Sequence, residues 1–233
     1  MTQPAVGAAT AKIIERAEEA FMAHGYAAPT MAMLGAACGL SRRALYYHFH
    51  SKEELFRGVL SYFNAKYLAA ADAIAEQALV RGDGATEVIG AYLDARYGET
   101  RRRLAGSPHG HELNDIGFRV GTDIMIDVAY EANRRLAEIV EVLCASGRLR
   151  LRPGTSADVA AAMIADGARG VNQARPPIPE GELAARYHAI ADAVLFGCAI
   201  DPSVAYRGPD QDDLASRETG VGPAGLEPAT RPL

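Results

Sequence analysis

Apolar side chains recur along most of this chain at the three- and four-residue spacing of an amphipathic α-helix, in several separate segments. In the first segment, isoleucine, alanine and phenylalanine side chains fall on one helical face and charged side chains on the other. We expect Thr10 to cap this helix and Gly25 to end it. The repeated pattern predicts an all-α protein, in which the first three helices pack together within residues 10–54.

The stretch from Met31 to Phe49 has the pattern of a helix-turn-helix, two short helices broken at Gly39-Leu40. Thr30 and Ser41 are suitable N-cap residues, and a glycine in the turn can adopt the positive φ that a tight connection needs. In the second helix, the spacing turns Leu45 and Phe49 toward the core. It leaves one exposed face, formed by Arg42, Arg43, Tyr46 and Tyr47.

This basic and aromatic face predicts DNA binding. Arginine can fork onto guanine in the major groove, and hydroxyl, imidazole and ammonium groups can donate to phosphates. We expect Arg42, Arg43 and Tyr46 to contact base edges, although Tyr46 or Tyr47 could instead serve packing. The expected phosphate contacts are Thr30, Ser41, Tyr47, His48 and Lys52.

After the helix-turn-helix, Ser51-Lys-Glu-Glu54 has the sequence of a capping box, in which the serine caps the helix and Glu54 reaches back to the serine N–H. The helical pattern then continues to about Val80, before Arg81-Gly-Asp-Gly84 breaks it. This long helix would connect the DNA-binding segment to the rest of the chain.

From about Ala11 to Leu60 the chain resembles the N-terminal domain of TetR-type transcriptional regulators. The resemblance rests on Phe21, Gly25, Tyr26 and Thr30, on the Ala-Ala-Cys-Gly-Leu-Ser turn, on Leu45-Tyr-Tyr-His-Phe49 and on Ser51-Lys-Glu-Glu-Leu-Phe56. His50 departs from the family, which often has proline or another turn residue there. The resemblance implies an all-helical homodimer that binds a double-stranded DNA operator and releases it when a small-molecule effector binds.

Five further helical segments are expected: residues 85–104, a short one from His111, 118–145, and a pair near the C-terminus. The Arg101-Arg-Arg103 triplet is interpreted as a solvated helix end rather than a second nucleic-acid patch. In similar proteins these helices enclose the effector pocket. On that basis, the expected pocket residues are Tyr92, Tyr97, Phe118, Met125, Tyr130 and Asn172.

The last two predicted helices carry small and apolar residues at helical spacing, which suits a partner helix. Periodicity alone does not decide whether that partner belongs to the same chain, but the family resemblance favours a four-helix dimer interface. The residues expected there are Ile164, Ala168, Leu183, Tyr187, Ile190 and Val194.

Charge is unevenly distributed along the chain. The net charge is −5, yet residues 1–66 hold seven Lys or Arg and five Glu, a balance of +2, which leaves −7 for the remainder. A local basic surface is sufficient for DNA binding, because phosphates respond to the patch and not to the total. No segment has the apolar length of a membrane span or the pattern of a signal peptide, so a soluble cytoplasmic protein is expected.

These patterns predict a flexible N-terminus (1–9), a helix-turn-helix domain (10–54), a helical ligand-binding and dimerisation domain (55–200) and a disordered tail (201–233). The three cysteines are widely spaced and fit no disulfide framework, and no cofactor or metal is expected. Two alternatives remain open. One is an enzyme using the His109-Gly-His-Glu112 cluster, and the other is a helical ligand carrier without DNA affinity.

Overall fold

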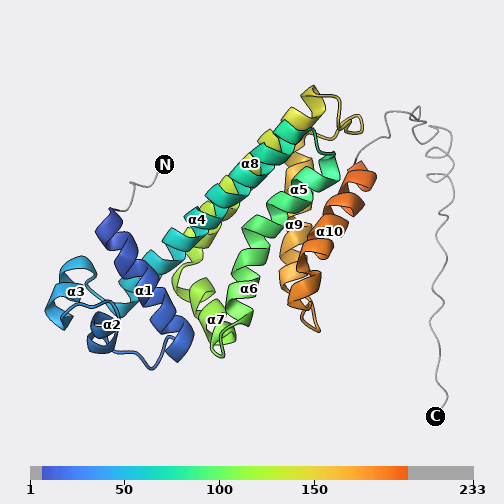
Figure 1. Cartoon of the computed structure of the whole chain (residues 1–233). Helices are drawn as coiled ribbons and strands as arrows, with labels where there is room; N and C mark the ends of the chain where they lie inside the picture. The colour runs from blue at the N-terminus through green and yellow to red at the C-terminus, as the bar shows by residue number, and fades with distance from the viewer. Residues whose placement is uncertain (1–6, 199–233) are drawn as a thin grey trace, which may run out of the picture. The chain divides into compact units, whose positions relative to one another are not determined.

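The computed structural model describes residues 7–198, which are helical with no strand among them. Figure 1 shows the arrangement of the helices. The helices are α1 (Ala8–His24), α2 (Met31–Ala37), α3 (Arg42–His48), α4 (Lys52–Arg81), α5 (Ala85–Leu93), α6 (Glu99–Ala105), α7 (Gly110–Val120), α8 (Thr122–Ala145), α9 (Ala157–Asn172) and α10 (Leu183–Cys198). We call α1 to α3 with the first turns of α4 the head, and the rest of α4 with the later helices the body.

Two short helical segments of other types complete the description. A π-helical turn, η1 (Asp94–Gly98), joins α5 to α6, and a 3₁₀ turn, η2 (Glu180–Glu182), precedes α10. The predicted all-α fold is confirmed. None of the helices in the described range has the length and hydrophobicity needed to cross a bilayer.

The head is built around one cluster of buried apolar side chains. Phe21 of α1 lies 5.1 Å from the ring of Phe56 on α4, and Tyr26 of the α1–α2 loop lies 5.0 Å from the same ring. Leu45 of α3 is fully buried among them, and Leu113 of α7 closes the cluster from the body side. The head core therefore extends past the predicted domain boundary at residue 54, because it uses the first turns of α4 and one residue of α7.

The body has a larger core shared by α4, α5, α8, α9 and α10. Alanines on α4 allow close packing, and two buried tyrosines, Tyr92 and Tyr187, fill the interior. The Tyr92 hydroxyl donates to the carbonyl oxygen of Ala132 on α8 at 3.3 Å, and the Tyr187 hydroxyl donates to Asn172 Oδ1 on α9 at 2.6 Å. These bonds satisfy the polar ends of two large side chains that burial would otherwise penalise.

Helix α4 links the head to the body as one continuous element, shown in teal in Figure 1. Ser51 Oγ accepts a hydrogen bond from the Glu54 amide at 2.9 Å, and Gly82 ends the helix with a φ of 82°. The predicted capping box is only half confirmed. Glu54 accepts from the amide of His50 at 2.6 Å and not from that of Ser51, because His50 also approaches the carboxylate with its ring.

Two predicted helix boundaries were wrong, and one predicted helix is not α-helical throughout. The first helix begins at Ala8 with Gly7 as its N-cap, so Thr10 lies inside it and residues 8–9 are helical. The expected 118–145 helix begins instead at Thr122, because Gly121 interrupts the pattern and ends α7. The expected 85–104 helix contains the π turn, which apolar spacing does not reveal. The rest of the predicted flexible N-terminus (1–6) and the predicted disordered tail (201–233) lie outside the described residues.

Candidate nucleic-acid interface

The turn between α2 and α3 has the geometry that the sequence predicted. Thr30 Oγ1 accepts from the Met33 amide at 3.3 Å, and Ser41 Oγ accepts from the Ala44 amide at 3.1 Å, so both helices are capped as expected. Gly39 has a φ of 70°, which a residue with a side chain adopts only with strain. Arg16 of α1 supports this turn by donating to the Cys38 carbonyl at 3.2 Å, a contact that no sequence pattern had indicated.

Helix α3 has two clearly different faces. Leu45 and the following Phe49 are buried in the head core, whereas the side chains of α3 predicted to contact bases and phosphates are exposed. The Arg42 guanidinium lies 5.5 Å from the centre of the Tyr46 ring, a cation–π contact that holds both on the surface. Tyr47 is 85% exposed, so it serves no packing role in the free protein.

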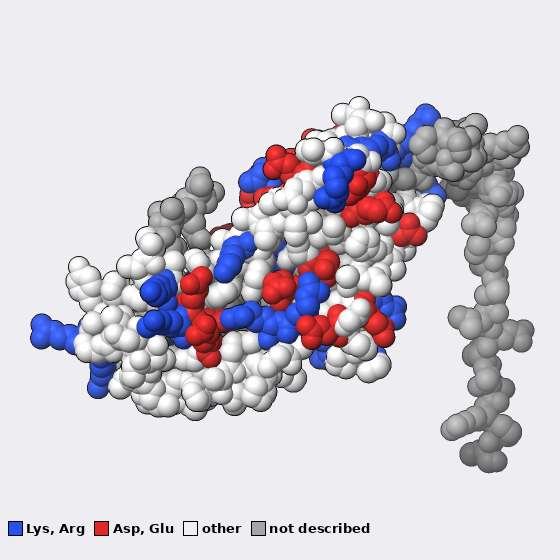
Figure 2. Space-filling model, viewed as in Figure 1, with Lys and Arg blue, Asp and Glu red and all other residues white. Residues whose placement is uncertain are grey.

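Figure 2 shows Lys and Arg side chains projecting from the end of the molecule formed by α2 and α3, whereas the acidic side chains visible in this view lie away from that end. Arg42, Arg43 and His48 line the exposed face of α3, which itself contains no acidic residue. A phosphate backbone approaching this end would therefore meet positive potential despite the negative charge of the whole chain.

Lys52 has a more specific position than the sequence suggested. Its Nζ donates to the carbonyl oxygens of Tyr26 at 2.8 Å and Ala27 at 3.0 Å, and lies 4.8 Å from the centre of the Tyr26 ring. Two of its three ammonium protons are thus directed into the α1–α2 loop. The phosphate contact of Lys52 stays a prediction. The third ammonium proton and the positive charge of the side chain are what Lys52 could offer a phosphate.

Glu112 of α7 holds the same loop from the body side. Its Oε1 accepts from the amides of Tyr26 at 3.0 Å and Ala27 at 2.9 Å. These backbone hydrogen bonds, that of Ala27 first, lower the pKa of the Glu112 carboxyl below its ordinary value, and His109 adds to the effect. We call this the Glu112–loop contact. It joins α7 of the body to the α1–α2 loop of the helix-turn-helix domain.

The His109-Gly-His-Glu112 cluster is therefore structural. Glu112 is engaged with the loop, His109 Nδ1 lies 3.5 Å from Glu112 Oε2, and His111 Nδ1 lies 3.3 Å from Asp115. No group of three potential metal ligands occurs among residues 7–198. Nearby, Arg103 pairs with Glu18 of α1, and this hydrogen-bonded pair raises the pKa of the arginine. One member of the arginine triplet, Arg103, thus contacts the head, whereas Arg102 pairs with Asp94 within the body.

The predicted pocket residues do not line one cavity. Phe118 and Tyr130 are 57% and 73% exposed, and Met125 is half-buried. The other three lie inside the body, where Tyr97 stacks on Tyr187 at 6.5 Å and Asn172 accepts from the same tyrosine. The helical periodicity could not distinguish these two groups, since it fixes which residues share a face but not what that face meets.

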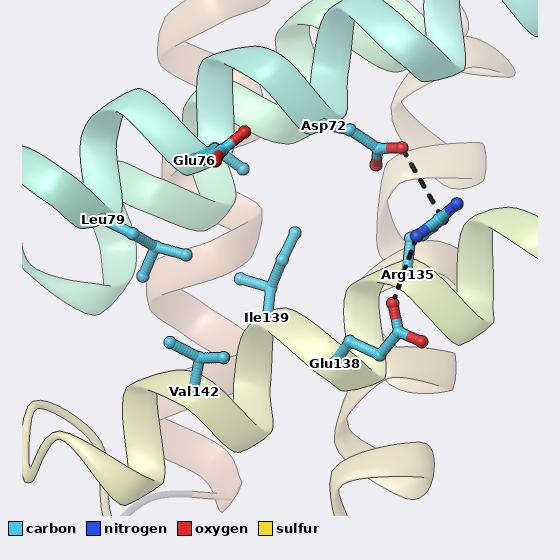
Figure 3. A pocket seen from close by; sticks show the side chains of 8 residues that line it. Asp72, Glu76, Leu79, Arg135, Glu138, Ile139 and Val142 are labelled. Carbon is cyan, nitrogen blue, oxygen red and sulfur yellow. Dashed lines mark hydrogen bonds and ion pairs between the residues drawn. The ribbon is translucent and has the colours of Figure 1, made fainter.

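A shallow groove of about 170 Å³ does lie between α4 and α8. Figure 3 shows Asp72 of α4 pointing toward Arg135 of α8 across this groove, with Glu138 on the other side of the arginine. The groove is smaller than the usual range of small-molecule sites, about 300–1,000 Å³. Ion pairs occupy it, so it is not a preformed effector pocket.

The expected dimer residues lie in the core of the single chain. Ile164, Ala168, Leu183 and Tyr187 are buried against neighbouring helices, and Val194 packs against the same core. Ile190 packs onto α9 where Gly167 leaves room for it, since a Cβ at Gly167 would come within 2.6 Å of the isoleucine. Within the chain, this seam takes part in the packing of α9 with α10; Ile164, Ala168, Leu183 and Tyr187 are buried there, whereas Ile190 and Val194 are half-buried.

The head of the chain matches one known protein family in sequence. Residues 13–59 match the sequence model of the bacterial regulatory proteins of the tetR family. None of the curated proteins matches the chain in sequence.

Several solved structures resemble the chain. SmeT, the repressor of the Stenotrophomonas maltophilia multidrug efflux pump SmeDEF, is 21% identical with a TM-score of 0.60, over 85% of this chain and 94% of SmeT. A transcriptional regulator from Cytophaga hutchinsonii is 20% identical with a TM-score of 0.64, over 81% and 97%. Thermus thermophilus FadR, a TetR-family repressor in complex with lauroyl-CoA, is 20% identical with a TM-score of 0.58, over 85% and 100%. At these identities the likeness concerns the fold.

Proposed function

We propose that this chain, a member of the tetR family of bacterial regulatory proteins, represses transcription by binding a DNA operator as a homodimer and releasing it when a small molecule binds the body. The family consists of transcription regulators, which are not enzymes. The observation that carries the proposal is the exposed basic and aromatic face of α3 on a capped helix-turn-helix. This face is the part of the fold that enters a major groove in helix-turn-helix proteins.

Within this interface, Arg42, Arg43 and Tyr46 are proposed to contact bases. Thr30, Ser41, Tyr47, His48 and Lys52 are proposed to contact phosphates. The arginines lie in the first turn of α3, which is the end of a recognition helix that meets base edges. Phosphate contacts at the α2 and α3 N-termini would fix the orientation of the head without reading sequence.

Specificity from so short a helix requires a second copy of the chain. We propose that α9 and α10 form the dimer interface through their outer face. Phe196 of α10 is 71% exposed, and Val159 and Met163 of α9 are 50% and 46% exposed. Small residues of α10 are exposed as well, among them Ala185, Ala189 and Ala193. A dimer would present its two recognition helices to successive major grooves, roughly 34–36 Å apart.

Effector release is proposed to act through α4, because this helix begins in the head and ends in the body. SmeT has also been solved with triclosan, so proteins of this fold accept small molecules. A ligand bound inside the body against α4 would tilt α4 and change the separation of the two heads. It would shift DNA affinity only to the extent that it binds the DNA-free conformation better.

The Glu112–loop contact is a second connection between the body and the head, in addition to α4. A movement of α7 would therefore reach the α1–α2 loop through Glu112. Glu112→Ala should expose the Tyr26 and Ala27 amides, so that their hydrogen exchange becomes faster at neutral pH, whereas Glu112→Gln keeps an acceptor and most of the protection. Because folding lowers the pKa of Glu112, the contact is complete above the ordinary carboxyl range and is lost only as the pH falls through the lowered value. Unchanged exchange in the alanine variant would contradict this role.

The base and phosphate assignments can be separated by their dependence on DNA sequence. Arg43→Ala should lose about 1–3 kcal/mol of discrimination between operator and random DNA. Lys52→Ala should weaken binding to both and flatten its dependence on salt. Binding isotherms over a series of salt concentrations measure both effects. An equal loss on operator and random DNA in the Arg43 variant would show that Arg43 does not read bases.

A further inference from the structure

Arg96 is a buried charge in the middle of the body. It belongs to η1, the π turn between α5 and α6, and this turn packs against α4, α9 and α10. The side chain is only 6% exposed, and it is one of two polar or charged residues buried in the described part of the chain. The other, Glu18, is paired with Arg103. Single π turns inside α-helices occur frequently at functional sites.

The Arg96 guanidinium lacks a counter-charge. Its Nη2 donates to Asn64 Oδ1 on α4 at 3.2 Å, and its centre lies 5.0 Å from the Tyr97 ring, but its Nε has no hydrogen-bond partner. Among residues 7–198 no carboxylate forms an ion pair with it. The nearest acidic residue in the same turn, Asp94, is bound instead by Arg102 at 2.9 Å.

Such a position is costly for a folded protein. Arginine stays charged in proteins, and a buried charge without a partner is one of the least favourable arrangements in an apolar core. Burial accordingly lowers the pKa of Arg96 from its ordinary value. A methionine of similar length would avoid the cost, so the arginine is explained best by an anion that is bound for part of the time.

The surroundings indicate what kind of anion this is. Around the guanidinium the body is aromatic and aliphatic, with Tyr92 one helical turn earlier and Tyr97 stacked on Tyr187. A second buried polar atom without a partner, Asn133 Oδ1, follows Ala132, the residue that the Tyr92 hydroxyl contacts. A monovalent carboxylate would neutralise one guanidinium, whereas a phosphate dianion would leave a surplus charge in the core.

We propose that Arg96 is the anchor for the carboxylate of an otherwise apolar effector, whose carbon skeleton packs among the interior tyrosines. This inference rests on the proposed function, since it names the chemical class of the molecule that releases the DNA. The guanidinium can fork onto both carboxylate oxygens, and its unpaired Nε lies on the edge that such a bidentate contact uses. Arg96 lies outside the groove between α4 and α8.

The same arginine connects the effector to the DNA-binding head. A carboxylate would compete with Asn64 Oδ1 for the guanidinium. Asn64 Nδ2 donates to the Leu60 carbonyl one turn earlier on α4 at 2.8 Å. Leu60 packs on the head core and against Gly121, where a Cβ would come within 2.7 Å of it. Binding at Arg96 would therefore alter α4 at the point where it passes from body to head.

The test compares acids with their uncharged primary amides on the full-length protein. Octanoate, decanoate and phenylpropanoate are each titrated against the matching amide at constant ionic strength, with the melting temperature and the dissociation constant as readouts. The acid should bind at least about tenfold more tightly than its amide, as expected for a charge-assisted bidentate contact. Arg96→Met should abolish that preference and raise the melting temperature of the ligand-free protein. Arg150→Met, at an exposed position, should change neither.

Equal binding of acid and amide by the wild type, a preference that survives in Arg96→Met, or no binding by any acid of the series would overturn the proposal. So would a lower melting temperature of ligand-free Arg96→Met, which would show that the arginine stabilises the core. DNA binding is measured in parallel. A protein that prefers acids but never binds DNA would refute the proposed function alone, and one whose DNA is released equally by acids and amides would refute the carboxylate anchor alone.

Discussion

Ala189→Glu should convert the protein from a dimer into a monomer and remove operator binding. Ala189 is exposed near the middle of α10, and Met163 of α9 and Phe196 of α10 are exposed apolar side chains of the same two helices. In a dimer the introduced carboxylate would be buried without a partner, at a cost of several kcal/mol. A monomer keeps only the contacts of one head, so operator affinity should fall about a thousandfold or more, toward the non-specific level.

Analytical ultracentrifugation and operator binding measure the two consequences together. Ala73→Glu is the matched control, because Ala73 is also an exposed alanine in the middle of a helix but lies on α4, away from the proposed interface. The control should remain dimeric and bind the operator normally. If Ala189→Glu stays dimeric at the same protein concentration, the two copies meet through another surface.

Leu45→Ala should unfold or loosen the recognition helix. Leu45 is the one buried residue within α3, and it is fully enclosed by the head core. Removing its side chain leaves a cavity and should lower the free energy of unfolding of the head by about 2–5 kcal/mol. Operator binding should be lost with it, although the body core, which contains no residue of α3, should keep its structure.

Tyr47→Ala separates folding from recognition on the same helix. Tyr47 is largely exposed, so its truncation should change stability by no more than about 0.5 kcal/mol. It should nevertheless weaken DNA binding, because the tyrosine hydroxyl is a proposed phosphate donor. Chemical denaturation and DNA titration of both variants distinguish the cases. Normal DNA binding by Leu45→Ala would show that the packing of α3 does not control recognition.

The head could be predicted from sequence because its determinants are local. Thr30, Ser41 and Ser51 cap the helices that follow them, and Gly39 has the positive φ that its turn requires. Each of these roles depends on residues within a few positions along the chain. The exposed and buried faces of α3 followed from its spacing for the same reason, and the match of residues 13–59 to the tetR family agrees with them.

The body was less predictable, because its important features depend on distant neighbours. Periodicity identified the buried faces of α9 and α10 correctly but could not show that these faces meet each other within one chain. The π turn around Arg96 leaves no signature in apolar spacing, and the missing partner of that arginine becomes visible only when the surrounding helices are placed. The contact of Glu112 with the α1–α2 loop likewise joins residues more than eighty positions apart.

The central claim is that this chain recognises a specific DNA site through two copies of its head. Footprinting of the purified full-length protein on the DNA upstream of its own gene, at moderate salt, tests it most directly. The account predicts one protected near-palindrome whose half-sites are about one helical turn apart. Absence of any protected site there would contradict it and would favour a helical ligand-binding protein without DNA affinity.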